Sequence, residues 1–374
     1  MTITTGTVRA TAAVLRTPDG PFRLEDVVLD APGRGEVVVR IAGVGLCHTD
    51  LLPRTPVVKP PVIAGHEAAG VVEAVGDGVA DPLVGDHVVL SFDSCGDCAN
   101  CLAAQPAYCE SFWPRNMSGK RADRSTGARD AEGNAVKGRW FGQSSFATHA
   151  VVAARNTIKV DPALPLELLG PLACGVLTGA GSVFNSLDLG PGTGLAVFGA
   201  GTVGLSAIMA ARVAGATTIV AVDLNPERLR LAEELGATHV VDATTPDLTQ
   251  HLKKLTGGGL EYTLDTTGVP TVITTAIDVL RLRGVCGLLG VQRGALAIRP
   301  DQFALGRTVK GILEGDAVPK LLIPRLIALW RQGRFPFDKL ITTFPLDEIN
   351  DAEAAMHAGS VVKPVLLPTP TKEL

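Results

Sequence analysis

The residues best suited to metal chemistry in this sequence are cysteines, and they fall into two sets. Four of them form one C-x2-C-x2-C-x7-C cluster: Cys95, Cys98, Cys101 and Cys109. Four thiolates can close a tetrahedral shell around zinc, as in structural sites. Cys47, His66 and Cys174 stand apart, and two thiolates with one imidazole leave a fourth position open for water or substrate. The pattern predicts two zinc ions per chain, one structural and one catalytic.

Disulfide bonds are the alternative explanation for the four-cysteine cluster. Residues 1–9 form a Thr-rich stretch without the apolar core of a secretory signal peptide, so we expect a cytoplasmic protein. In that reducing compartment, closely spaced cysteines bind metal more often than they form bridges. The seventh cysteine, Cys286, lies in the apolar run 285–289 and is expected to be a small buried hydrophobic residue.

Composition excludes several classes of partner. The chain has 374 residues and 46% hydrophobic content, enough for two domains with large cores. Its 34 basic and 38 acidic residues give a net charge of −4, without a basic run that would favour nucleic acid or an anionic membrane. No apolar stretch approaches the length of a membrane span. We therefore expect neither nucleic acid nor a membrane as a partner.

The pattern of strands and helices changes near residue 178. Before it, Val-rich runs separated by Gly, Pro and Asp indicate a β-rich domain; these runs are 36–41, 71–75 and 87–90. After it, strands and helices alternate, with a strand at 195–198, a helix at 203–213 and a strand at 219–222. A further helix is predicted from Asn225, its N-cap, to Gly236. This second region therefore predicts a doubly wound parallel sheet.

A glycine-rich motif lies between the first strand and helix of that region, with the sequence Gly199-Ala-Gly201-Thr202-Val203-Gly204. Its glycines permit a tight turn, close approach to a pyrophosphate and close helix packing, while the helix N-terminus faces the phosphates. Asp223 follows Gly204 by nineteen residues, where a carboxylate accepts hydrogen bonds from ribose hydroxyls and repels a 2′-phosphate. The alternative is a glycine turn with an unrelated surface aspartate. The motif and spacing together favour NAD over NADP.

The sequence resembles the zinc-containing alcohol dehydrogenases of the medium-chain dehydrogenase/reductase superfamily over essentially its whole length. The matching motifs are Cys47-His48-Thr49-Asp50, then Gly65-His66-Glu67-x2-Gly70-x5-Gly76, the four-cysteine lobe and Cys174. The resemblance implies an α/β fold of three parts. These are a GroES-like β-rich catalytic domain at 1–178 with the zinc lobe at about 95–109, a Rossmann NAD-binding domain at 179–318, and a return to the catalytic domain at 319–374. It also implies a homodimer or homotetramer.

Within that family the chain is most similar to the bacterial aryl-alcohol (benzyl-alcohol) dehydrogenases. The supporting segments are Phe141-Gly-Gln143-Ser-Ser-Phe146, Leu168-Leu-Gly170-Pro-Leu172 and Arg331-Gln-Gly-Arg-Phe-Pro-Phe-Asp-Lys-Leu340. Geraniol-oxidising enzymes share much of this pattern. The resemblance implies reversible, NAD-dependent oxidation of primary benzylic or allylic alcohols to aldehydes. Zinc lowers the pKa of the bound alcohol, and the resulting alkoxide releases hydride to the nicotinamide.

The resemblance also assigns roles to individual residues. Thr49 would relay the alcohol proton, His48 would lie at the cofactor pyrophosphate, and Asp50 and Glu67 would orient and tune the zinc ligands. The other implied cofactor contacts are Thr178, Thr202, Val203, Arg228 and Lys363. Four further residues are candidates to pack an apolar substrate: Phe92, Trp140, Phe141 and Ile312. Trp140 and Phe141 are preferred because aromatic rings suit a flat aryl group. Each of these residues also has a plain interpretation as core or surface.

One position departs from the family pattern. Many alcohol dehydrogenases have a histidine four residues after the first zinc cysteine that completes the proton relay, and this chain has Leu51 there. We expect the proton to leave through the ribose to water or by way of His48. The polar segment 110–138 is a candidate flap over the cleft.

Two other functions stay open on the sequence alone. A thiol-adduct formaldehyde dehydrogenase of the same family would need an anion-binding mouth, and the sequence shows no clear one. A catalytically inactive relative that only binds NAD would commonly have lost zinc ligands, whereas this chain keeps Cys47, His66 and Cys174.

Overall fold

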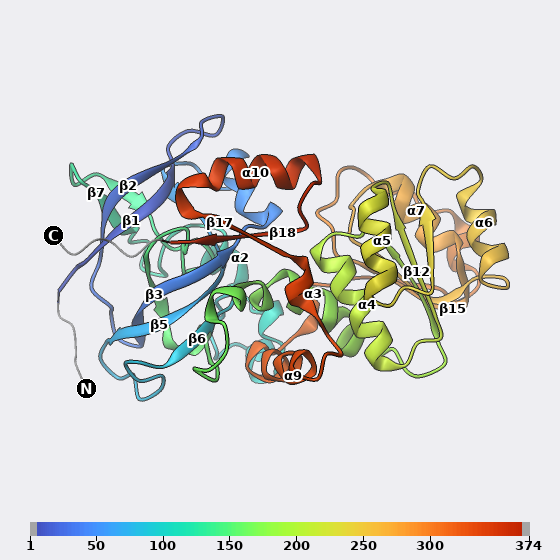
Figure 1. The fold of residues 1–374 in the computed structure, drawn as a ribbon, viewed down its shortest axis with the longest axis horizontal. Coiled ribbons are helices and arrows are strands. Elements are labelled where there is room, and N and C mark those ends of the chain that lie inside the picture. Colours follow the sequence, from blue (N-terminus) through green and yellow to red (C-terminus); the bar gives the residue numbers. More distant parts are fainter. Residues whose placement is uncertain (1–5, 369–374) are drawn as a thin grey trace. The chain divides into compact units, whose positions relative to one another are not determined.

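A computed structural model describes residues 6–368. The chain divides into two compact units (Figure 1). Of the described residues, the first unit contains 6–174, 318–324 and 340–368, and the second contains Gly175–Ala317 and Arg325–Lys339. The sequence had assigned 325–339 to the return segment, but these residues cluster with the second unit. Within residues 6–368, no helix combines the length and apolar character needed to cross a membrane.

The first unit is built on two β-structures. A closed barrel has the strand order β1 (Val8–Leu15), β2 (Phe22–Leu29), β7 (Gly127–Asp130), β8 (Ala135–Lys137) and β4 (Val62–Ile63). The larger sheet has the order β10 (Thr157–Lys159), β6 (His87–Leu90), β5 (Glu67–Val75), β3 (Glu36–Gly45), β18 (Lys363–Leu367) and β17 (Ile341–Pro345), and β9 (His149–Ala153) pairs with β3. The predicted Val-rich strands fall in β3, β5 and β6, which confirms the β-rich character of this region.

Short helices occupy the connections of this unit. They are η1 (His48–Arg54), α1 (Ala99–Leu102), α2 (Phe112–Asn116), η6 (Gly170–Ala173) and α10 (Ile349–Ala358). Helix α9 (Pro319–Arg331) begins in the first unit and ends among residues of the second. The segment 110–138, expected as a flap, instead contributes α2 and two strands of the barrel. Its backbone hydrogen bonds are therefore made inside the unit.

The second unit is a six-stranded parallel sheet. Its order is β13 (His239–Asp242), β12 (Thr218–Asp223), β11 (Gly194–Phe198), β14 (Leu260–Asp265), β15 (Leu280–Leu288) and β16 (Thr308–Gly311). Its helices are α3 (Gly175–Gly181), α4 (Thr202–Ala214), α5 (Pro226–Leu235), α6 (Leu248–Leu255), α7 (Pro270–Asp278) and α8 (Pro300–Phe303). The alternation confirms the predicted doubly wound fold.

Local sequence explains two features of this sheet. All residues of β11 are buried, as expected for a strand covered on both faces. Helix α5 begins as predicted, because the Asn225 side chain accepts hydrogen bonds from the backbone N–H groups of Glu227 and Arg228. Cys286 lies in the apolar core, where burial raises the pKa of its thiol to about 12. That thiol is therefore a packing group, as expected.

A partly buried ion-pair network ties the barrel to the larger sheet of the first unit. Glu36, at the start of β3, accepts hydrogen bonds from Arg139 at 2.7 Å and from Arg121 at 3.1 Å. Arg121 also donates to Asp30 at 2.8 Å. Burial alone would raise the pKa of Glu36, but the guanidinium groups of Arg139 and Arg121 outweigh it and hold that pKa below its usual value. The ionised carboxylate therefore stabilises the fold.

We expect Glu36→Gln to lower the free energy of unfolding by about 3 kcal/mol at pH 7, because it leaves the buried Arg139 without its anion. Because the pKa of Glu36 is lower in the folded than in the unfolded protein, its carboxylate stabilises the fold at every pH above the unfolded pKa of about 4.5. This stabilisation is lost as the pH falls through the folded pKa. The difference between wild type and variant should therefore shrink below about pH 4. Urea titrations of both proteins at pH 7 and below about pH 4 measure this difference in the free energy of unfolding. Glu73→Gln, in an exposed pair with Arg40, is the control and should cost under about 1 kcal/mol. An equal loss for the two variants would contradict the account.

Candidate active site and metal centres

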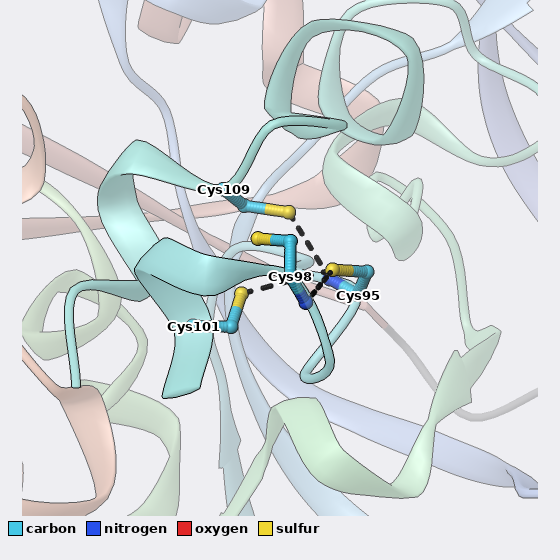
Figure 2. A group of neighbouring side chains, drawn as sticks. All are labelled: Cys95, Cys98, Cys101 and Cys109. Carbon is cyan, nitrogen blue, oxygen red and sulfur yellow. Dashed lines mark hydrogen bonds between the residues drawn. The ribbon is translucent and has the colours of Figure 1, made fainter. Parts of the chain in front are cut away.

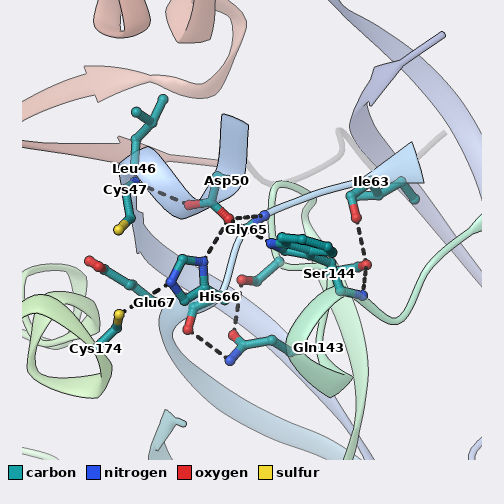
Figure 3. Close-up of polar contacts among 12 residues, drawn as sticks. Leu46, Cys47, Asp50, Ile63, Gly65, His66, Glu67, Gln143, Ser144 and Cys174 are labelled. Atoms are coloured by element: carbon teal, nitrogen blue, oxygen red, sulfur yellow. Dashed lines mark hydrogen bonds and ion pairs between the residues drawn. The ribbon is translucent and has the colours of Figure 1, made fainter. Parts of the chain in front are cut away.

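Three predicted ligands of the catalytic metal meet in the first unit. Cys47 lies between β3 and η1, His66 directly precedes β5, and Cys174 follows η6. Ligand atoms of these residues and of Glu67 all lie within 4.8 Å of one another. His66 Nε2 is 3.3 Å from the Cys174 Sγ (Figure 3). Two sulfurs and one imidazole nitrogen around one point fit a zinc ion that keeps a position open for a further ligand.

The Asp50 carboxylate joins the ligands of this cluster through hydrogen bonds. It is fully buried, and its Oδ1 accepts hydrogen bonds from His66 Nδ1 at 2.7 Å, from the Gly65 N–H at 2.9 Å and from Trp140 Nε1 at 3.2 Å. Its Oδ2 accepts from the Cys47 N–H at 3.1 Å. Because a carboxylate only accepts, the His66 proton resides on Nδ1 and the Nε2 lone pair faces the thiols. Asp50 therefore sets the tautomer and orientation of the ligand, as expected of it.

The segment after Phe141 supports the His66 backbone. Gln143 Nε2 donates to the His66 carbonyl at 2.9 Å, and Ser144 Oγ donates to the Ile63 carbonyl at 2.6 Å (Figure 3). The Phe141 ring stacks on the His66 ring, with 4.4 Å between centroids and 26° between planes. The contacts of Gln143 and Ser144 with the backbone around His66 were not predicted from the sequence. Its side chains hold the metal ligand in place.

The charges in the cluster favour a thiolate at Cys47. A hydrogen bond with Cys174 is the largest influence on that thiol, and with His66 and Lys363 it outweighs burial and holds the pKa of Cys47 well below its usual value. Metal binding needs the deprotonated sulfur. The site is therefore poised to accept a cation.

Lys363, expected at the cofactor, has its amino group beside the metal cluster, and its role toward the cofactor stays a prediction. It is buried at the start of β18, and its Nζ donates to Glu67 Oε2 at 2.8 Å, Glu67 Oε1 at 3.0 Å and the Leu46 carbonyl at 3.2 Å. An ammonium has three N–H donors, and two of these three contacts go to the Glu67 carboxylate. Burial alone would lower the pKa of Lys363, but Glu67 outweighs it and raises that pKa. Lys363 is thus the counter-ion of a carboxylate at the metal cluster.

We expect Asp50→Asn to weaken zinc binding at the catalytic cluster by about 10- to 100-fold, because the amide no longer fixes the His66 tautomer. Competition with a chromogenic chelator measures the affinity. Asp93→Asn, a buried aspartate of the same unit that bonds to Arg115 instead of a ligand, is the matched control and should retain wild-type affinity. Unchanged zinc affinity in Asp50→Asn would contradict the role assigned to this carboxylate.

The aromatic residues predicted for the substrate pocket are buried. Trp140 is fully buried, and its indole N–H is bonded to Asp50, so its role in the pocket stays a prediction. Phe92 packs against Phe112 with ring centroids 5.9 Å apart. Ile312 belongs to the second unit, where it is buried in the hydrophobic core. The pocket role of Phe92, Phe141 and Ile312 stays a prediction.

The four cysteines of the lobe also come together, and none is in a disulfide (Figure 2). Their sulfurs lie within 4.8 Å of one another. The Cys95 N–H donates to the Cys109 Sγ at 3.2 Å, and the Cys98 N–H donates to the Cys95 Sγ at 3.3 Å. Four sulfurs in this space fit a tetrahedral zinc ion with no open position.

The lobe thiols differ in how readily they ionise. Backbone hydrogen bonds from Glu110 and Cys101 lower the pKa of Cys98 to about 6. The Asp97 carboxylate raises the pKa of Cys95 to about 12, and burial raises the pKa of Cys101. A dication bound among them would supply the positive charge that all four thiolates need. The donor set therefore fits a metal better than it fits four free thiols.

The glycine-rich loop of the second unit has the shape of a dinucleotide cradle. A Cβ on Gly204 would lie 1.8 Å from the Gly199 carbonyl oxygen, so only glycine allows this close packing. A Cβ on Gly201 would meet nothing within 4 Å, which leaves open space beside the backbone where a pyrophosphate can approach. Asp223 ends β12 and accepts from the Ala200 N–H at 2.6 Å, so its carboxylate is fixed beside the loop. These residues fit NAD.

The remaining predicted residues are placed as follows. Thr202 and Val203 begin α4, and Arg228 lies in the first turn of α5. Thr178 is on α3, and its hydroxyl is 3.4 Å from the Glu314 carboxylate, a contact that the sequence analysis missed. His48 is exposed with its ring edge-on to His357, and Thr49 is half-buried next to it. Their roles toward cofactor and substrate stay predictions.

Comparison with known proteins places this geometry in a family. Residues 33–162 match an alcohol dehydrogenase GroES-like domain, and residues 202–328 match a zinc-binding dehydrogenase domain. A geraniol dehydrogenase from Castellaniella defragrans is 46% identical over 365 residues, covering 96% of this chain and 98% of the relative.

Two solved structures are also similar over their whole length. An alcohol dehydrogenase zinc-binding domain protein from Burkholderia ambifaria has a TM-score of 0.95 and 48% identity, covering 97% of this chain and 100% of that one. A benzyl alcohol dehydrogenase from Acinetobacter calcoaceticus has a TM-score of 0.93 and 39% identity, with the same coverage. Together with the metal-binding cluster and the dinucleotide cradle, these matches show that the chain belongs to the zinc-containing alcohol dehydrogenases of the medium-chain dehydrogenase/reductase superfamily.

Proposed function

We propose that this enzyme uses NAD and two zinc ions per chain to oxidise primary benzylic or allylic alcohols reversibly to aldehydes. The observation that carries the proposal is the cluster of Cys47, His66 and Cys174, held by Asp50, in a chain that also has a dinucleotide cradle. Zinc held by these residues would act as a Lewis acid on the alcohol oxygen, and NAD would accept the hydride.

The protein's own contribution is orientation and proton handling. Asp50 fixes His66, and the Phe141 ring stacks on the face of its imidazole. The Thr49 hydroxyl, two residues after Cys47, is the group that would take the alcohol proton. Leu51 cannot continue the relay, so the proton would pass to the cofactor ribose and water or to His48. The exposed ring of His48 has access to solvent for this purpose.

We expect Thr49→Ala to lower kcat by about 100-fold, because the proton then lacks a positioned acceptor. Thr49→Ser keeps the hydroxyl and should retain most of the activity. Zinc content, measured on the same preparations, should equal that of wild type. Wild-type turnover in Thr49→Ala with full zinc would show that this hydroxyl is not the relay.

The substrate class rests on two relatives. One is named for geraniol and the other for benzyl alcohol, at 46% and 39% identity. Both alcohols are primary, and in both the carbon that bears the hydroxyl is bonded to a double bond or an aromatic ring. That shared feature defines the class proposed here.

Initial rates of NADH formation test the proposal, with benzyl alcohol, geraniol, ethanol and a formaldehyde–thiol adduct as substrates and NAD or NADP as acceptor. We expect kcat/KM for benzyl alcohol or geraniol with NAD to exceed that for ethanol by at least about 100-fold. Activity only with the thiol adduct would keep the family and contradict the substrate class. Absence of any rate in a protein with two bound zinc ions would support the non-catalytic alternative.

We also propose that the chain forms a homodimer or homotetramer through the β16 side of the second unit. Strand β16 lies at the edge of the sheet. Several exposed apolar residues lie on the neighbouring strand β15 or in the segment that leads from it to β16: Leu282, Val291, Ile298, Phe303 and Leu305. Such residues beside an open strand edge suit pairing with a second copy. Light scattering after size exclusion should give twice or four times the chain mass, and a monomer mass would contradict this.

A further inference from the structure

The segment after β16 has an unusual backbone. Three consecutive residues have φ in the left-handed region, with +50° at Glu314, +66° at Gly315 and +50° at Asp316. Two of them are not glycine, so the conformation is unfavourable unless surrounding structure holds it. Strained turns of this kind occur preferentially at functional sites.

Contacts within the second unit hold the turn. Asn185 Nδ2 donates to the Gly315 carbonyl at 3.2 Å and to the Asp316 carbonyl at 3.4 Å. Lys310 Nζ is 3.4 Å from the Asp316 carboxylate. A Cβ on Gly315 would lie 2.8 Å from the Thr178 carbonyl oxygen, so the turn packs directly on the backbone of α3.

The turn places a buried carboxylate beside Thr178. Glu314 is 7% exposed, and the Thr178 hydroxyl lies 3.4 Å from its Oε2. The proposed chemistry gives this carboxylate no role. Burying an acidic side chain costs free energy, and so does a strained turn. The position of Glu314 therefore needs an explanation other than packing.

The topology indicates which part of the cofactor this carboxylate faces. All six strands are parallel, so the turn after β16 lies at the same carboxyl edge of the sheet as the glycine-rich loop after β11. A dinucleotide lies across this edge, over the point between β11 and β14 where the strand order reverses. Asp223, on β12, marks the adenosine side. The nicotinamide therefore lies on the side of β14, β15 and β16, where Glu314 is found.

We propose that Glu314 sets the preference of the enzyme for the oxidised cofactor, by placing a negative charge near the nicotinamide. The nicotinamide ring is cationic in NAD+ and neutral in NADH. A carboxylate in low-dielectric surroundings attracts the cationic ring of NAD+ and has little effect on the neutral ring of NADH. The inference rests on the proposed use of NAD. It adds a residue that determines how strongly NAD+ is bound relative to NADH.

The test is the affinity of each cofactor form for the full-length protein without alcohol, measured by calorimetry for NAD+ and by fluorescence titration for NADH. Glu314→Gln should weaken NAD+ binding by about tenfold and NADH binding by less than about twofold. Glu314→Asp keeps the charge and should stay close to wild type. Asp316→Asn, which removes a charge from the same turn, is the control and should leave the ratio of the two dissociation constants unchanged.

Equal weakening of both forms in Glu314→Gln, or no change in either, would overturn the inference while leaving the proposed function intact. Failure of the wild-type protein to bind either form would overturn the proposed function and this inference with it. If Glu314→Gln does not fold, Glu314→Ala provides the test, because it removes the carboxylate without placing an amide in the turn. That variant should shift the ratio in the same direction by about tenfold, and an unchanged ratio would overturn the inference.

Discussion

Replacing Cys174 with serine is expected to lower kcat by about four orders of magnitude and to reduce bound zinc from two ions per chain to one. The sulfur of Cys174 lies 3.3 Å from His66 Nε2 and is one of only two thiol ligands in the catalytic cluster. A zinc ion that polarises the alcohol oxygen is worth several kcal/mol of barrier, and a factor of 10⁴ corresponds to about 5.5 kcal/mol.

Metal analysis and NADH formation on the same preparation measure both effects. The matched control is Cys286→Ala, which removes a cysteine that is buried in the core of the second unit and belongs to neither cluster. It should retain two zinc ions and the turnover of folded enzyme. Wild-type turnover in Cys174→Ser with one zinc ion lost would show that the three-ligand cluster is not the site of reaction.

Replacing Cys98 with serine is expected to remove the other zinc ion and to lower the thermal unfolding midpoint of the protein by about 10–20 °C. The lobe at 95–109 contains only the short helix α1 and one 3₁₀ turn, so a metal held by its four sulfurs would be its main source of order. Structural zinc contributes its binding energy directly to folding, and we expect a loss of about 5 kcal/mol. Calorimetry combined with metal analysis measures this.

The control for Cys98→Ser is Asp97→Ala, which changes the exposed neighbouring residue and leaves all four sulfurs in place. It should keep both zinc ions and unfold within about 2 °C of wild type. A Cys98→Ser protein that unfolds at the wild-type temperature would contradict a structural role for the metal in this lobe.

Local patterns were sufficient to predict much of the fold. The helix from Asn225 to Gly236 was predictable because its cap, its proline and its terminal glycine are all encoded within a few residues. The glycine-rich loop was predictable for the same reason, since the tight fit of Gly204 against Gly199 involves neighbours in the chain. The two cysteine sets were distinguished by spacing and residue type alone.

Contacts between distant residues could not be predicted in this way. Lys363 and Glu67 are separated by 296 positions, and only the pairing of β18 with β3 brings them together. Trp140 was assigned to the pocket because its ring suits an aryl group, but burial of the ring against Asp50 depends on the fold around it. The positive φ of Glu314 has no sequence signal, because the residue type argues against it.

The most direct test of the account is the rate of NADH formation from benzyl alcohol and geraniol as the catalytic zinc is removed and restored. A chelator should extract the zinc of the open three-ligand site before that of the closed four-sulfur site. We predict that the rate falls in proportion to the first zinc ion lost per chain and returns when zinc is added back. A rate that persists after that ion has been removed would contradict the assignment of Cys47, His66 and Cys174 as the centre of the reaction.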